Sequence, residues 1–408
     1  MEKSRKPKIR FKGFTDDWEQ RELGNIGQTY TGLSGKTKDD FGHGHAQFVT
    51  YMNVFSNPIC NPKMNEPIEV DSKQNEVEVG DVFFTTSSET PKEVGMTSVL
   101  IEKQGKMYLN SFCFGYRLYE KYDSYYLAYM LRSNSFREKI IMLAQGISRY
   151  NISKNKVMEI DVFVPSYKEQ MEIGKYFRDL DTLITLHQRK LDKLVNVKKS
   201  MLEKMFPQQG SRIPEIRFCG FTDDWEQRKL VELLTKYTDE VNVPHNGYER
   251  LGIRSHAKGT FHSYVSEGHE LQTGKMHKVA ADKFIVNITF GWEHAVAVTD
   301  KNDAGKLVSH RFPQYSLSEN LYSKFFKYII LDDKFKHHLW LSSPGGAGRN
   351  RVLKLDEMLE YKIKIPNVQE QQKIAEVLMD LDHLITLHQR KLEKLKNIKK
   401  SMLEKMFI

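Results

Sequence analysis

Two short polar loops carry side chains of the kinds that recognise bases in double-stranded DNA. Arginine and asparagine can each make two hydrogen bonds to a guanine or adenine edge, and lysine suits phosphate. The loops contain Arg149, Tyr150, Asn151 and Lys154 in the first half and Arg349, Asn350, Arg351 and Lys354 in the second. We therefore predict two base-reading loops. The alternative is a glycine-rich loop that holds a framework arginine in a salt bridge.

A third polar loop contains Arg254, His256 and Lys258 and is a further candidate of the same kind. The segment Thr86–Lys92 is another polar loop of the same kind, on weaker grounds.

Catalytic chemistry is not predicted anywhere in the chain. The segment Tyr30–Thr37 approaches a phosphate-binding loop, but tyrosine stands where that motif needs its first glycine. Phe41–His45 has misplaced glycines for a methyl-donor loop, and the Asn/Asp-Pro-Pro-aromatic tetrapeptide of amino-methyltransferases is absent. Neither the histidines nor the 3 cysteines have metal-ligand spacing, so we predict no metal site and no disulfide framework.

The elements that must position these loops occur twice. Pro7–Leu23 returns almost unchanged as Pro214–Leu230, and Asp179–Phe206 returns with four substitutions as Asp380–Phe407. The residues between the repeats differ. A duplicated framework of this kind predicts a pseudo-two-fold molecule whose two variable centres bind different things.

Each half ends in a segment that we predict to be a long helix. Tyr167–Phe206 counts 40 residues, or about 60 Å, and the patterns Ser166–Glu169 and Asn367–Glu370 predict capping boxes at the helix starts. Apolar residues in steps of four and three predict a coiled-coil seam. Its members are Leu180, Ile184, His187, Leu191, Leu194 and Met201 in the first helix and Leu381, Ile385, His388, Leu392, Leu395 and Met402 in the second.

The simplest arrangement pairs the two helices antiparallel, with His187 and His388 as a polar pair that sets the register. The alternative is two independent helices, each packed on its own domain. We expect an α+β fold: two globular α/β target recognition domains, at 1–165 and 208–366, separated by the long helices at 166–207 and 367–408.

Within the domains, short β-branched and aromatic runs predict strands at 82–86, 97–101, 108–119, 160–164, 283–288, 295–298 and 361–365. Segments 125–144 and 321–341 predict one helix each, and 24–47 predicts a long loop.

Composition favours a polyanionic partner. The formal charge is +9 and the isoelectric point is about 9.1. Solvated lysines on long helices could produce the same total. No stretch approaches 20 apolar residues, so we expect a cytoplasmic protein with no membrane partner.

The whole chain resembles the DNA specificity subunit of a bacterial type I restriction-modification system. The resemblance rests on the two Phe-x-Gly-Phe-Thr-Asp-Asp-Trp-Glu segments, the basic loops, the Pro-x-x-x-Glu-Gln segments at 165–170 and 366–371, and the long helices. It implies a subunit without catalysis of its own that reads a bipartite, asymmetric site in double-stranded DNA. It also implies two modification subunits that methylate adenine with S-adenosylmethionine, and restriction subunits that use ATP and Mg.

Two other classes of protein remain possible. A free-standing repressor would bind its bipartite site tightly and alone, whereas a coiled-coil adaptor would show no salt-dependent DNA affinity. The bases read, the spacer length and the order of assembly cannot be derived from the sequence.

Overall fold

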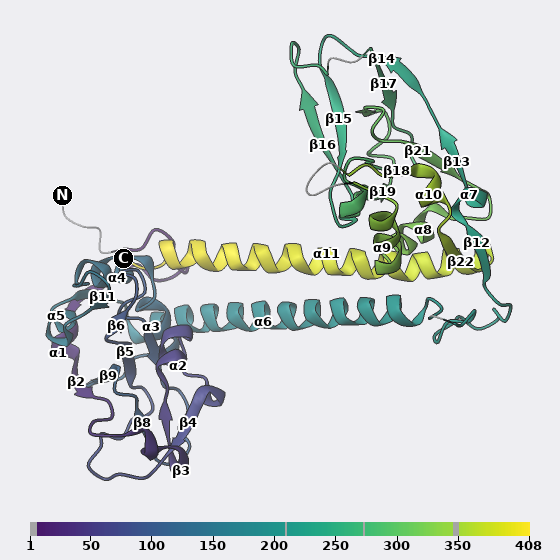
Figure 1. The fold of residues 1–408 in the computed structure, drawn as a ribbon. Coiled ribbons are helices and arrows are strands. Elements are labelled where there is room, and N and C mark those ends of the chain that lie inside the picture. The colour runs from purple at the N-terminus through teal and green to yellow at the C-terminus, as the bar shows by residue number, and fades with distance from the viewer. Residues whose placement is uncertain (1–5, 209, 272–273, 346–350) are drawn as a thin grey trace. The chain divides into compact units, whose positions relative to one another are not determined.

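The computed structural model describes residues 6–208, 210–271, 274–345 and 351–408. Its contacts group into two compact units, residues 1–190 with 388–408 and residues 191–387. Each unit therefore contains one globular α/β domain and one half of each long helix (Figure 1).

The first domain is built on two sheets. A four-stranded antiparallel sheet has the order β2 (Gly27–Thr31), β9 (Cys113–Leu118), β5 (Val82–Thr85), β7 (Thr97–Val99). A three-stranded sheet has the order β4 (Asn65–Ile68), β3 (Phe41–Val49), β8 (Met107–Leu109). Two short pairs complete it, β1 (Glu19–Glu22) with β11 (Asp161–Val164) and β6 (Ser87–Ser88) with β10 (Tyr150–Asn151). The helices are α1 (Leu23–Ile26), α2 (Tyr51–Ser56), α3 (Ser124–Met130), α4 (Asn134–Met142) and α5 (Lys154–Met158).

The second domain repeats this plan. Its four-stranded sheet has the order β13 (Leu234–Tyr237), β21 (Gln314–Leu317), β18 (Lys283–Val286), β19 (Val296–Val298). Its five-stranded sheet has the order β14 (Glu240–Asn242), β17 (Lys275–Lys278), β20 (Leu307–Val308), β15 (Tyr248–Ile253), β16 (Thr260–Val265). β12 (Glu226–Lys229) pairs with β22 (Lys362–Ile365), and the helices are α7 (Leu230–Leu233), α8 (Ser323–Ile329), α9 (Asp333–Leu341) and α10 (Leu355–Leu359).

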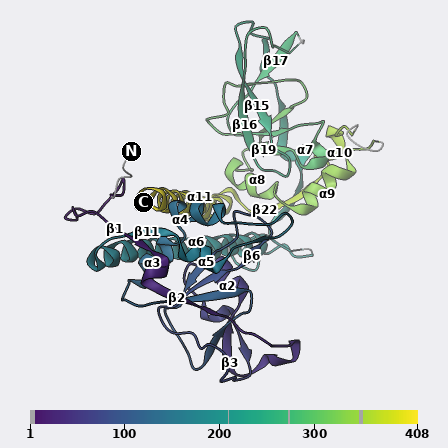
Figure 2. The same ribbon diagram turned by 90° about the vertical axis from the view of Figure 1, so that its left-hand side faces the viewer.

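The long helices are α6 (Tyr167–Lys204) and α11 (Val368–Lys405). In the first unit, the beginning of α6 lies beside the end of α11 in both views (Figures 1 and 2). Asp181 accepts a hydrogen bond from Lys399 at 2.6 Å, and the Nδ1 atoms of His187 and His388 are 2.9 Å apart. Residue numbers rise along one helix as they fall along the other, so the pairing is antiparallel. The second unit has the matching ion pair, Lys198 with Asp382 at 2.6 Å.

Each domain core is closed by the end of a long helix. In the first unit, Phe407 packs on Tyr126 and Phe177. In the second unit, Phe206 stacks on Phe325, which in turn packs against the buried Trp225. The repeated sequence thus supplies equivalent core residues to both units.

The predicted capping boxes are half wrong. The Ser166 and Asn367 side chains do accept from the backbone N–H of Glu169 and Glu370. The two glutamates do not turn back to the caps. Glu370 is fully buried and forms two hydrogen bonds with Arg217, both at 2.8 Å, and Glu169 pairs with Arg10 in the same way. Two hydrogen bonds from one guanidinium stabilise a buried carboxylate more than one hydrogen bond from a backbone amide does.

Four predictions of secondary structure are also wrong. Segments 125–144 and 321–341 each form two helices, because Ser133 and Asp332 cap the starts of α4 and α9. Residues 24–47 contain α1, β2 and most of β3, whose weak strand propensity is overcome by pairing with β9 and β8. The single strand predicted at 108–119 is interrupted between β8 and β9.

Candidate nucleic-acid interface

In the first domain, four segments meet around β6. The backbone of Tyr150 and Asn151 pairs with Ser88 and Ser87, and Ile152 donates its N–H to the carbonyl of Thr86 at 3.0 Å. These contacts attach the predicted loop to β6.

Two further segments join from other parts of the domain. Thr86 donates its N–H and its hydroxyl to the carbonyl of Phe112, and the Tyr51 hydroxyl donates to the carbonyl of Ser87 at 2.8 Å. We call residues 51–52, 86–88, 111–112 and 147–151 the first face. Arg149 and Asn151 are exposed on it and Tyr150 is half-buried, while Lys154 is exposed at the start of α5.

Two half-buried arginines hold the backbone of segments that adjoin the first face. Arg132 donates to the carbonyls of Thr97, Val54, Phe55 and Asn57, and Arg137 to those of Lys92, Val94 and Gly95. Burial lowers the pKa of each to about 10. Both stay charged at neutral pH, and their hydrogen bonds fix the end of α2, the start of β7 and the loop at residues 92–95.

The second domain has an equivalent arrangement. Leu353 donates its N–H to the carbonyl of Ile288 at 2.9 Å, and Ile288 donates to that of Arg311 at 3.0 Å. Ile288 therefore corresponds to Thr86, and Arg311 to Phe112. We call residues 254–258, 288–293, 311 and 351–354 the second face.

The polar loop that contains Arg254, His256 and Lys258 connects β15 to β16, and all three of these side chains are exposed. His256 and Ala257 donate their backbone N–H groups to the carbonyls of Glu293 and His294, both at 2.8 Å. The loop is therefore hydrogen-bonded to the segment between β18 and β19. In the first domain, the hydrogen bond from Tyr51 to β6 is the comparable contact.

The backbone is strained where this loop meets the segment between β18 and β19. His256, Ala257 and His294 all have positive φ, at 61°, 48° and 61°, although none is glycine. Strain of this kind gathers at binding sites and persists only where neighbours hold it. His294 is buried and its Nε2 donates to the carbonyl of Ile330 at 2.7 Å. Burial lowers the pKa of His294, so its ring is neutral at neutral pH and supports the strained backbone through the hydrogen bond to Ile330.

The last predicted loop is only partly described. Arg349 and Asn350 lie outside the described residues. Arg351 places its guanidinium over the half-exposed ring of Trp340, 4.8 Å from the ring centre. Lys354 is exposed and forms an ion pair with Glu357 at 2.7 Å.

The seam residues lie where the two long helices face each other. Leu180, Leu191, Leu392 and His388 are buried, and the other eight predicted members are half-buried. Leu183, Leu186, Leu384 and Leu387, which lie outside the predicted seam, are 38–55% exposed. The role of the histidine pair in setting the register stays a prediction.

Sequence reasoning misses Tyr51, Phe112 and Arg311, whereas Ser87 lies in the polar loop Thr86–Lys92. The sequence predicts no element at Tyr51 and places Phe112 inside a continuous strand. The local signal for Phe112 was Asn110, whose side chain accepts from the Phe112 N–H at 2.9 Å and makes the turn.

Within the described ranges, no cluster of three or more histidine, cysteine, aspartate or glutamate side chains could hold a metal ion. Across those same residues, no helix is long and apolar enough to cross a membrane. The two domains thus present polar, partly basic faces of matched construction and different composition. This is the class of protein that recognises two different targets through a duplicated scaffold.

A family model described as the type I restriction modification DNA specificity domain matches residues 15–196 and 223–397. The chain therefore belongs to this family.

Two curated relatives come from Methanocaldococcus jannaschii. The chain is 25% identical over 413 residues to the MjaX type I restriction enzyme specificity subunit, covering 95% of this chain and 92% of the relative. It is 24% identical over 296 residues to the MjaVIII specificity subunit, covering 69% and 68%. The crystal structure of the type I restriction-modification S subunit from M. genitalium has the same fold, with a TM-score of 0.57, 13% identity and 99% coverage of both chains.

Proposed function

We infer that this chain is the sequence-specific DNA-recognition subunit of a type I restriction-modification complex, with no catalysis of its own. The observation that carries the inference is the pair of matched faces. The same hydrogen-bonded framework, centred on Thr86 and on Ile288, presents different side chains in the two domains. Two unlike faces suit a bipartite, asymmetric site in double-stranded DNA, which a symmetric dimer could not read.

The partners follow from the repeated helices. Leu183 and Leu186 recur as Leu384 and Leu387 within identical stretches, and all four are exposed. Exposed apolar residues on a helix mark protein contacts when they recur as a set. A surface present twice in one chain supports binding of two identical modification subunits, one at each leucine pair.

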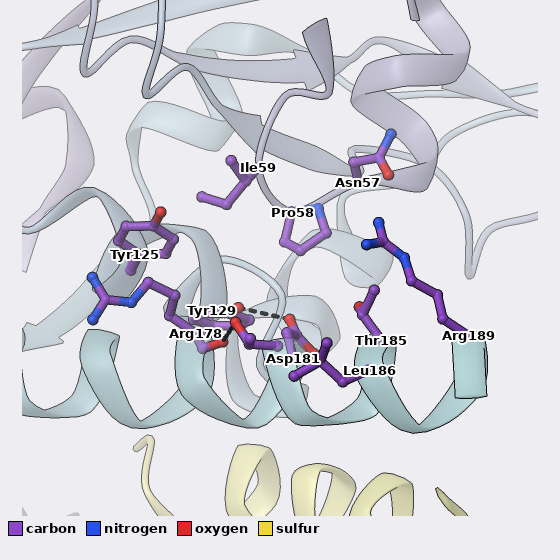
Figure 3. Close-up of a pocket in the computed structure, with 11 residues that line it drawn as sticks. Asn57, Pro58, Ile59, Tyr125, Tyr129, Arg178, Asp181, Thr185, Leu186 and Arg189 are labelled. Carbon is purple, nitrogen blue, oxygen red and sulfur yellow. Dashed lines mark hydrogen bonds between the residues drawn. The ribbon is translucent and has the colours of Figure 1, made fainter. Parts of the chain in front are cut away.

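In the first unit, Leu186 borders an open groove of about 380 Å³. Figure 3 shows Leu186 and Arg189 on α6 at its edge, with Tyr125 and Pro58 from the domain across from them. The Tyr129 hydroxyl donates to Asp181 at 2.7 Å on the floor of the groove. A partner helix with apolar and acidic side chains would complement Leu186, Arg178 and Arg189 in this groove.

The catalytic cofactors would belong to the partners. Modification subunits would bring S-adenosylmethionine, and restriction subunits would bring ATP and Mg. The proposal places the complex in the cytoplasm, where the chromosome and invading DNA are accessible.

The test is to co-express this chain with a type I modification subunit and map methylated adenines across a genome. We expect one bipartite site whose two halves are unrelated in sequence, with methylation lost when either half is changed. A free-standing repressor would instead bind its site tightly without a partner, and no adenine would be methylated. That result would overturn the proposal.

A further inference from the structure

The first face is apolar at one position where the second face is charged. Phe112 is 57% exposed, and its counterpart on the second face is Arg311. Ile147 is 96% exposed, so its side chain touches almost nothing in the protein. The position equivalent to Ile147 in the second half falls within residues 346–350, which lie outside the described residues.

Ile147 is held in place although it is exposed. Gln145 and Asn151 exchange two backbone hydrogen bonds, at 3.0 and 2.8 Å, and close the loop on which Ile147 stands. Gly146 has a φ of 139° and passes so close to the carbonyl of Arg149 that any Cβ would collide with it. The closed loop therefore presents a branched apolar side chain next to Arg149.

A hydrogen bond also ties Phe112 to this arrangement. Its carbonyl accepts from Thr86, and Thr86 in turn accepts from Ile152 at the end of the same loop. The Thr86 backbone thus holds both Phe112 and the Ile147 loop. The face combines a cation, an amide and three exposed apolar side chains, those of Met52, Phe112 and Ile147.

In the major groove, the edges of the base pairs carry one apolar group, the C5-methyl of thymine. We propose that Ile147, with Phe112 beside its loop, contacts the methyl group of a thymine in the half-site read by the first face. The inference rests on the proposed function and adds to it the identity of one base in the recognised site. The second face has the charged Arg311 at the position of Phe112 and exposes Phe290 and Val352 elsewhere, so the inference concerns the first half-site alone.

The experiment uses the complex with the modification subunit on its mapped site. Each thymine of the first half-site is replaced singly by deoxyuridine, which removes only the methyl group. We expect one or two positions to lower affinity about 3–10-fold, the effect of losing one buried methyl contact.

The variant Ile147→Ala should lower affinity for the unmodified site by a similar factor and bind thymine and deoxyuridine equally. Val79→Ala is the matched control, because Val79 is 60% exposed in the same unit but lies outside the first face. It should keep the wild-type preference for thymine.

Three results would overturn the inference while leaving the proposed function in place. The first half-site could contain no thymine, every deoxyuridine could be neutral, or Ile147→Ala could weaken binding without changing the preference for thymine. The third result would place Ile147 against stacked bases instead. Failure of the wild-type complex to bind or methylate any specific site would count against the proposed function itself.

Discussion

At the scale of residues, the two buried ion pairs make the clearest prediction. Glu370 is fully buried and Arg217 is 11% exposed. Arg217→Met would leave a carboxylate without its partner in the core, and we expect unfolding free energy to fall by roughly 3–5 kcal/mol. Chemical denaturation of the purified chain measures it.

The double variant Arg217→Met, Glu370→Met is the control. Replacing both partners with apolar side chains removes the unpaired charge, so most of the lost stability should return. A double variant as unstable as the single one would contradict this account and point to packing instead.

The same pairs show what a local pattern can predict. Ser166 and Asn367 cap their helices as their sequence positions indicate, because capping involves residues three apart. The partner of Glu169 is Arg10, which is 159 residues away. Nothing near Glu169 in the sequence reveals Arg10, so this half of the pattern was read wrongly.

For the first and second faces too, local sequence predicts only part of the arrangement. Residue types in the loops around Arg149 and Arg254 identified candidates for base recognition. Their attachment to Thr86 and to Glu293 depends on backbone hydrogen bonds between distant segments. Backbone contacts leave no signature in side-chain identity, which is why Tyr51 and Phe112 were missed.

At the scale of elements, the histidine contact between α6 and α11 predicts a dependence on pH. The two Nδ1 atoms, 2.9 Å apart, need one donor and one acceptor, so both rings cannot be protonated there. Burial lowers the pKa of His388, and Lys190, His187 and Lys391 lower it further. Below its ordinary pKa near 6.5, the unfolded chain takes up this proton more readily than the folded chain.

Stability should therefore fall as pH decreases from about 7.5 to 5.5. We expect His187→Leu with His388→Leu to reduce that fall and to raise the melting temperature at pH 7.5 by roughly 2–4 °C, the effect of ~1 kcal/mol. Part of the fall should remain, because His294 also has a lowered pKa. Thermal unfolding at both pH values measures this.

His383→Thr is the matched control for the seam. His383 is exposed on α11, and threonine is the residue at the equivalent position of α6, Thr182. This variant should unfold as the wild type does at both pH values. An unchanged melting temperature and pH response in the double leucine variant would show that the pair does not matter for stability.

At the scale of the whole molecule, the duplication predicts how many partners bind. The leucine pairs of α6 and α11 are equivalent, so each should bind one modification subunit. Leu186→Asp should leave one partner per chain, and Leu186→Asp with Leu387→Asp should leave none. Both side chains are exposed, at 55% and 38%, so the chain itself should keep its stability.

Val195→Asp separates this prediction from a general effect of charge on the helices. Val195 is 45% exposed on α6, but its equivalent on α11 is Lys396, so it does not belong to a repeated surface. This variant should still bind two partners when the mass of the complex is measured by light scattering. Two partners bound to the double leucine variant would place docking elsewhere, whereas one partner bound to the wild type would mean that only one of the equivalent surfaces is used.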